Sequence, residues 1–126
     1  MLEEQLTQKI IGCAFNVYNV LGFGFLEKVY ENAFRIEMEL QGLKVEQQMP
    51  ISVFYKGEIA GNYCADLLVE NKVLIELKSI QALSREHEVQ LVNYLKATGI
   101  SIGLLINFGP TTVQIKRRLK EMEKSD

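Results

Sequence analysis

The chain has 126 residues, of which 48% are apolar and 24% are charged, so we expect one folded domain over residues 1–126 and exclude wholesale disorder. The formal net charge of −2 excludes the global basic excess that drives indiscriminate binding to nucleic acid. No apolar run approaches the roughly 20 residues that cross a bilayer, and no signal-peptide pattern is present, so we expect a cytoplasmic protein without a membrane span.

The first forty residues show the apolar spacing of two amphipathic helices. Residues 3–21 place apolar side chains three and four positions apart, and this helix is predicted to end at the glycines of LGFGF. A second apolar stripe runs from Leu26 to about Gln41, and Gly42 lies where a left-handed residue would end the helix. We expect both helices to face the core.

The pattern changes after Leu43 to short segments rich in β-branched and aromatic residues. KVEQQM, ISVFY and residues 58–70 are predicted as strands, with a turn at Lys56-Gly57. Pro50 is expected to mark a sheet edge or a bulge, because proline cannot donate to a β-ladder. Residues 72–79 form the hairpin partner and complete a meander.

A further helix and a buried strand follow the meander. Ser84 is predicted to cap a helix that runs to about Thr98 and stops at Gly99. The strand at residues 101–107 then returns parallel to residues 72–79 through a right-handed crossover. The last segment, TTVQIKRRL, is compatible with an edge strand or a helix. The predicted fold class is α/β, with a mixed β-sheet flanked by helices.

Two cysteines and one basic run remain. Cys13 and Cys64 form no pair of the metal-binding or secreted type, so we expect both to be reduced and mostly buried. The run KRRLK at residues 116–120 favours a solvated edge strand or terminal helix over a contact with nucleic acid.

The predicted hairpin in YCADLLVENKVLIELKS carries charged residues on both arms. Because side chains two apart on a strand share a face, Glu76 and Lys78 lie on the same face as Leu74. A three-residue loop at residues 70–72 would place Asp66 opposite Glu76, whereas a two-residue loop would put Asp66 on the apolar face. We therefore favour the three-residue loop, which brings Asp66, Glu76 and Lys78 together.

The placement of two carboxylates opposite each other has two possible explanations, a metal site or a salt bridge. At about 5 Å they repel by roughly 3 kcal/mol at an effective dielectric constant near 20. A divalent cation such as magnesium between the two carboxylates would make the net interaction favourable, because hard cations bind carboxylate oxygens and need few protein ligands. Lys78 would then orient or deprotonate a water and steady the charge of a phosphate. The structural alternative is an exposed cross-strand salt bridge.

Two helices carry further candidates. Glu27 and Tyr30 lie one turn apart at the start of the second helix, where Glu27 either reaches over the sheet as a ligand or compensates the helix dipole. On the third helix Gln90 and Tyr94 share a face, so Gln90 could support a metal or a phosphate with Tyr94 at the rim of the site. The single histidine, His87, is interpreted as a surface or capping residue, since one histidine builds neither a catalytic triad nor a zinc site.

Together these segments resemble a known family. GFLEKVY at residues 24–30 fits the signature of the GxxExxY proteins, a small bacterial and archaeal family in the PD-(D/E)XK nuclease superfamily. ADLLVENKVLIELK resembles the D…ExK core of that superfamily, QLVNY resembles the QxxxY motif of its RecB-like exonuclease branch, and LLINFG resembles the closing strand. The likeness extends from about residue 5 to residue 118, with the motifs in the expected order.

The resemblance implies a restriction-endonuclease-like αβββαβ core. The ligands that it implies for Mg²⁺ or Mn²⁺ are Glu27, Asp66 and Glu76. It further implies that Lys78 serves the attacking water and that Gln90 supports the site. The rim of the site is expected to include the two tyrosines, Tyr30 and Tyr94.

Two functions are compatible with this resemblance. The first is a metal-dependent nuclease that hydrolyses phosphodiester bonds in DNA in preference to RNA. The second is a catalytically silent binding or scaffold module that keeps the nuclease fold and docks a partner protein in a larger assembly. Cys64 stands where the family usually has arginine, which removes a phosphate contact and leaves the metal ligands in place. Because an acidic chain supplies little positive charge, we also expect a homodimer that juxtaposes two basic carboxyl ends.

Overall fold

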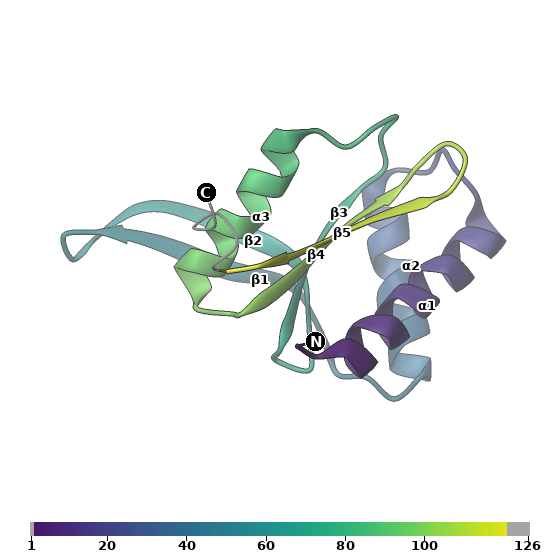
Figure 1. Cartoon of the computed structure of the whole chain (residues 1–126), viewed down its shortest axis with the longest axis horizontal. Helices are drawn as coiled ribbons and strands as arrows, with labels where there is room; N and C mark the ends of the chain where they lie inside the picture. The colour runs from purple at the N-terminus through teal and green to yellow at the C-terminus, as the bar shows by residue number, and fades with distance from the viewer. Residues whose placement is uncertain (1, 121–126) are drawn as a thin grey trace.

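The fold was analysed in a computed structural model, which describes residues 2–120 (Figure 1). Its elements in chain order are α1 (Glu4–Leu21), α2 (Glu27–Leu40), β1 (Val45–Tyr55), β2 (Glu58–Val69), β3 (Val73–Lys78), α3 (Arg85–Thr98), β4 (Ile102–Phe108) and β5 (Val113–Leu119). The strands form one sheet in the order β1-β2-β3-β4-β5, in which β3 and β4 are parallel and the other pairs are antiparallel. The predicted α/β class and the crossover through α3 are confirmed.

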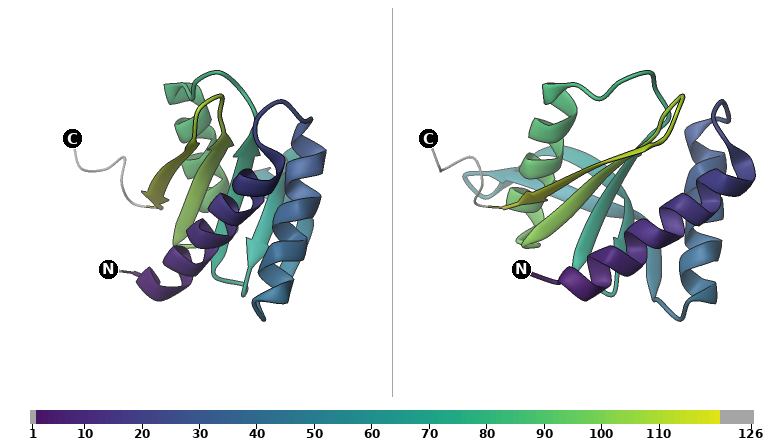
Figure 2. Two further views of the ribbon diagram at one scale, coloured as in Figure 1. Left: turned by 90° about the vertical axis from the view of Figure 1, so that its right-hand side faces the viewer. Right: turned by 45° about the vertical axis from the view of Figure 1, so that its right-hand side comes forward.

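The sheet is the middle of three layers. Figure 2 shows α1 and α2 against one face and α3 on the other. Alternation along β3 supplies both faces, because Ile75 and Leu77 pack toward α1 and α2 whereas Leu74 packs toward α3. The larger core lies under α1 and α2 and includes the fully buried Phe34 and Phe108.

The third helix begins and ends where the sequence predicted. The Ser84 N–H donates to Nδ1 of His87 at 3.0 Å, so His87 is a capping residue as expected. Gly99 ends the helix in the left-handed region at φ 78°, a conformation that costs glycine little.

The two edge strands of the sheet test the predictions for Pro50 and for the terminal segment. KVEQQM and ISVFY are one continuous strand, β1, which runs through Pro50 along one edge. Pro50 thus lies on an edge strand, as expected, and the left-handed residue of this strand is Gln48, at φ 53°. TTVQIKRRL contains β5, so the terminal segment is an edge strand rather than a helix.

The hairpin between β2 and β3 has the predicted three-residue loop. Glu70 and Asn71 adopt positive φ, and the ladder pairs Val69 with Val73. The ladder then ends after the third pair, Leu67 with Ile75. Beyond this point β2 leaves β3 and continues with β1 as a two-stranded arm that projects from the sheet, as Figure 1 shows.

The arm explains one wrong expectation. Cys13 is buried on the core-facing side of α1, but Cys64 is exposed because it lies on β2 beyond the point where the two strands separate. Within the described part of the chain, no helix is long and apolar enough to span a bilayer.

Candidate active site at the fork between two strands

The separation of β2 from β3 creates a fork, and the first residues past the last ladder pair are Asp66 and Glu76. The Asp66 N–H donates to Oε2 of Glu76 at 3.0 Å, and the Leu77 N–H donates to Oδ2 of Asp66 at 2.8 Å. Backbone donors that lose a ladder partner need another acceptor when they are buried. The two carboxylates therefore face each other across the fork and accept the hydrogen bonds of its backbone.

Burial disfavours the charged form of both groups. Glu76 is only 8% exposed, and burial, followed by the charge of Asp66, raises its pKa to about 8. Burial also raises the pKa of Asp66, although the hydrogen bond from Leu77 acts in the opposite direction. Lys78 follows Glu76 by two residues on β3, so the two side chains share a face, and the charge of Lys78 lowers the pKa of both carboxyl groups. Additional positive charge at the fork would favour two ionised carboxylates.

A third buried acid, Glu31 on α2, was not predicted from the sequence. It is 4% exposed, and its Oε1 accepts a hydrogen bond from Nε2 of Gln48 at 2.9 Å. The same amide lies 3.4 Å from Oδ1 of Asp66, and Gln47 also donates to the Glu31 carboxylate. The left-handed conformation of Gln48 explains how two successive strand residues reach one carboxylate, since side chains normally alternate. One signal was present in the sequence, because Glu31 lies four residues after Glu27 on the same helical face.

Glu27 and Tyr30 occupy different environments. Glu27 is the exposed first residue of α2. The effect of its charge is the smallest of those that raise the pKa of Glu76. Tyr30 was expected at the rim, and this is wrong, because its side chain is fully buried and stacks on Phe108 with ring centroids 4.5 Å apart. Its hydroxyl donates to the carbonyl of Gly22, so Tyr30 holds the loop that leads to Glu27.

Gln90 and Tyr94 approach the fork from α3. Nε2 of Gln90 donates to the Tyr94 hydroxyl at 2.7 Å. Tyr94 packs in one buried cluster with Ala65, which directly precedes Asp66 on β2, and burial and then the charge of Glu76 raise the pKa of Tyr94. Gln90 itself is exposed, so its link to the pair runs through Tyr94.

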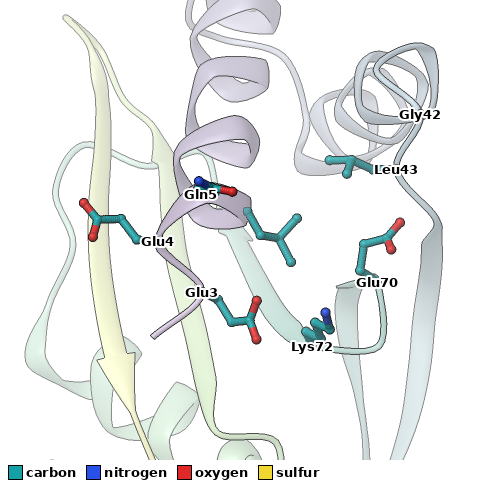
Figure 3. A pocket seen from close by; sticks show the side chains of 8 residues that line it. Glu3, Glu4, Gln5, Gly42, Leu43, Glu70 and Lys72 are labelled. Carbon is teal, nitrogen blue, oxygen red and sulfur yellow. The ribbon is translucent and has the colours of Figure 1, made fainter. Parts of the chain in front are cut away.

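A separate hollow of about 590 Å³ lies at the opposite end of β3, beside the turn that joins it to β2. Figure 3 shows Glu3 and Glu70 on different sides of this hollow, while Glu4 points away from Lys72. One of these groups has a clear structural task, because Oε2 of Glu70 accepts the Lys44 N–H at 2.6 Å. We therefore place the candidate site at the fork.

Residues 2–120 contain no group of three or more His, Cys, Asp or Glu side chains arranged as a complete metal cage. The fork supplies the buried Glu76 and the half-buried Asp66, and the Gln48 amide links Asp66 to Glu31 on α2. The arrangement is thus a partial set of hard oxygen donors with a lysine beside it.

Comparison with known proteins places this geometry in context. No curated protein sequence matches the chain. Among solved structures, the chain is similar to one described as the crystal structure of SSO0001, with 15% sequence identity and a TM-score of 0.61. The match covers 94% of this chain and 59% of the other chain, so this chain spans about three-fifths of its length. Identity at this level shows the fold alone, and the fold is the restriction-endonuclease-like one that was expected. A family model described as the PD-(D/E)XK nuclease superfamily matches residues 4–119, and the protein therefore belongs to that superfamily.

Proposed function

We propose that the protein is a nuclease that uses Mg²⁺ or Mn²⁺ to hydrolyse phosphodiester bonds in DNA in preference to RNA. One observation carries this proposal: the half-buried Asp66 and the buried Glu76 face each other at the fork, and burial raises the pKa of both. Acids whose pKa values are perturbed by burial are typical of functional sites. The superfamily supplies the reaction class.

The donor set at the fork fits a hard divalent cation. Mg²⁺ binds carboxylate oxygens, retains several waters and commonly needs only one or two protein carboxylates. We assign Asp66 and Glu76 as its principal ligands, with Glu27 on α2 as the third. The positive charge of a bound cation would favour the charged form of both fork carboxylates. Metal binding would therefore offset the free-energy cost of burying these two groups.

Each neighbouring side chain has a role in this proposal. When bound, the metal would supply Lewis-acid chemistry and neutralise negative charge at the phosphate. Lys78 orients or deprotonates the attacking water and contributes positive charge toward the phosphate. Gln90 supports the site through the Tyr94 hydroxyl. Gln48 fixes Asp66 from the side of β1, because its amide reaches both Asp66 and Glu31.

We further propose that the chain belongs to the GxxExxY group of the superfamily. The three signature residues have distinct structural tasks that support this assignment. Gly24 adopts φ 118°, which side-chain-bearing residues rarely adopt. Tyr30 clamps the same loop through its hydrogen bond to Gly22, and Ser79 at the end of β3 donates to the carbonyl of Phe25 at 3.1 Å. These contacts fix the loop that leads into α2, at whose first residue Glu27 lies.

One observation favours the alternative of a catalytically silent module. The fork carboxylates already accept hydrogen bonds from the backbone N–H groups of Asp66 and Leu77, so both acids have a structural task without any metal. Binding and cleavage must therefore be measured separately.

The test compares the wild type with Glu76→Gln by calorimetry and by cleavage of labelled oligonucleotides in Mg²⁺ or Mn²⁺. We expect Mn²⁺ affinity to fall at least tenfold and cleavage at least a hundredfold in Glu76→Gln. Glu39→Gln is the matched control, because Glu39 pairs with Arg35 on the surface of α2 and its loss should change neither quantity. Equal Mn²⁺ affinity in wild type and Glu76→Gln would refute the site, whereas Glu76-dependent binding without cleavage by the wild type would establish the silent module.

The homodimer stays a prediction. Arg117 donates to Oγ1 of Thr7 at 2.8 Å, and Arg118 pairs with Glu88. Both arginines thus have partners within the chain, which reduces the positive charge that they could offer to a substrate. Light scattering at micromolar concentration tests the dimer directly, and a monomeric mass would exclude it.

A further inference from the structure

A second concave surface lies next to the fork and has no assigned role. It is a groove of about 550 Å³ between the arm and α3. Phe54 and Tyr63 line it from the arm, and Gln90, Asn93, Tyr94 and Lys96 line it from α3. It therefore presents aromatic rings, two amides and an ammonium along one groove.

The ring of Tyr63 is held in place by its surroundings. A side chain at Gly61 would place its Cβ 3.2 Å from the Tyr63 ring, so glycine at this position lets the ring lie close over the strand. On the other side the ring meets Tyr94, with centroids 5.6 Å apart and planes tilted by 46°. Tyr63 nevertheless remains 48% exposed. Since a large aromatic ring is both fixed and open to solvent, it is suited to contact a flat ligand.

The charge of the groove differs from that of the chain. The chain has a formal charge of −2, yet none of the described residues that line the groove is acidic, and Lys96 lies at its border. Asn93 and Gln90 add amides that can donate and accept hydrogen bonds. The groove thus suits an anionic ligand with a flat ring and polar edges.

The groove also lies close to the fork. Tyr94 lines the groove and packs in the same buried cluster as Ala65, which directly precedes Asp66 on β2, and Gln90 donates to the Tyr94 hydroxyl. Tyr63 precedes Asp66 by three residues on β2, which corresponds to about 10 Å along a strand. A polymer held at the fork would therefore extend naturally into the groove.

We infer that this groove binds an unpaired base of a nucleic acid strand, which stacks on Tyr63 while the neighbouring backbone reaches the fork. The inference rests on the proposed function and names its substrate class, because stacking on an aromatic ring requires a base whose face is free. In a duplex those faces are covered by neighbouring base pairs. The protein should therefore prefer single strands, or the frayed end of a duplex, over a continuous duplex.

Binding without cleavage isolates the inference from the proposed reaction. The probe is a fluorescein-labelled oligothymidylate of twelve nucleotides, measured by anisotropy in EDTA at low salt, with a blunt duplex of equal length as the comparison. We expect the single strand to bind at least tenfold more tightly than the duplex. Tyr63→Leu should weaken single-strand binding by about tenfold, in line with the loss of one stacked base, and Phe54→Leu should weaken it less.

Matched controls separate the groove from the arm as a whole. Tyr55→Leu removes a ring that is also exposed on the arm but does not line the groove, so it should leave binding unchanged. Gly61→Val provides a second route to the same loss, because it displaces the Tyr63 ring while keeping it in the chain. Thermal melts of each variant establish that it is folded.

Three results would overturn the inference. The first is equal affinity for the single strand in wild type, Tyr63→Leu and Phe54→Leu. The second is equal affinity of the wild type for single strand and duplex. The third is a dimer by light scattering that Tyr63→Leu dissociates without loss of oligonucleotide binding, which would assign the groove to a second copy of the chain. None of these results bears on Mn²⁺ binding at Glu76, and a failure of that metal test would leave the anisotropy result in place.

Discussion

The two ends of the β2–β3 pair have the same alternating sequence pattern. They differ in which groups pair with the backbone. At the turn end, Val69 pairs with Val73 and Leu68 with Leu74, and all four side chains are buried. At the fork end, the ladder stops and two carboxylates accept the backbone hydrogen bonds instead.

The difference shows that position alone does not determine the energetic effect of a buried side chain. Burial of an apolar side chain at the turn end removes hydrocarbon from water and stabilises the fold. Burial of a carboxyl group at the fork end acts against its ionisation and opposes folding near neutral pH. The carboxyl groups at the fork end therefore lower the free energy of unfolding. We propose that they are there to bind a metal ion.

The pH dependence of stability should expose this cost most clearly. The Glu76 carboxyl holds its proton more tightly in the folded chain, with a pKa of about 8 against 4.5 for a free glutamate side chain. The free energy of unfolding should therefore fall as pH rises between these values, by as much as about 5 kcal/mol. Urea unfolding of wild type and Glu76→Gln in EDTA, at pH 5 and pH 8, measures the effect.

Glu76→Gln cannot ionise, so its unfolding free energy should vary less over this range, and at pH 8 it should exceed that of the wild type. Saturating Mg²⁺ at pH 8 should raise wild-type stability more than that of the variant. Parallel pH profiles for the two proteins would contradict the assignment of a strained carboxyl pair.

Truncation of a buried apolar side chain at the turn end should lower stability, and the loss should not depend on pH. Leu74 is fully buried beneath α3, and Leu74→Ala should lower the free energy of unfolding by about 3 kcal/mol at any pH between 5 and 8. Ile36→Ala is the matched control, because Ile36 is half exposed on α2 and its truncation should cost much less. Denaturant unfolding gives both values. A cost for Leu74→Ala that changes strongly with pH would link the two ends and weaken the comparison.

Sequence alone sufficed where local rules and long-range packing agree. The register that opposes Asp66 to Glu76 followed from keeping a carboxylate off the apolar face, and the three-residue loop and its first two pairs are confirmed. The end of α3 followed from Gly99 for the same reason, because a local signal and the packing of the helix require the same boundary.

The rest depended on contacts between distant segments. Glu31 is buried because Gln47 and Gln48, from a strand more than ten residues away, bring their amides to it, and no spacing rule anticipates a left-handed glutamine in β1. Tyr30 was misplaced because helical spacing gives the face of a residue but not its depth. Cys64 was misplaced because alternation does not show where a strand leaves its neighbour.

The smallest predicted effect concerns the loop that fixes the register. Asn71 adopts φ 56°, a left-handed conformation that asparagine tolerates and that β-carbon sterics make costly for most residues. Asn71→Ala should therefore lower the free energy of unfolding by about 1 kcal/mol, whereas Asn71→Gly should be neutral or slightly stabilising. Thermal or urea unfolding of the two variants provides the measurement. Because the adjacent Glu70 is also left-handed and is held by its hydrogen bond to Lys44, the loop should keep its length in both variants, and Mn²⁺ affinity at the fork should not change. Equal destabilisation by alanine and glycine would mean that the Asn71 side chain, rather than its backbone conformation, stabilises the turn end.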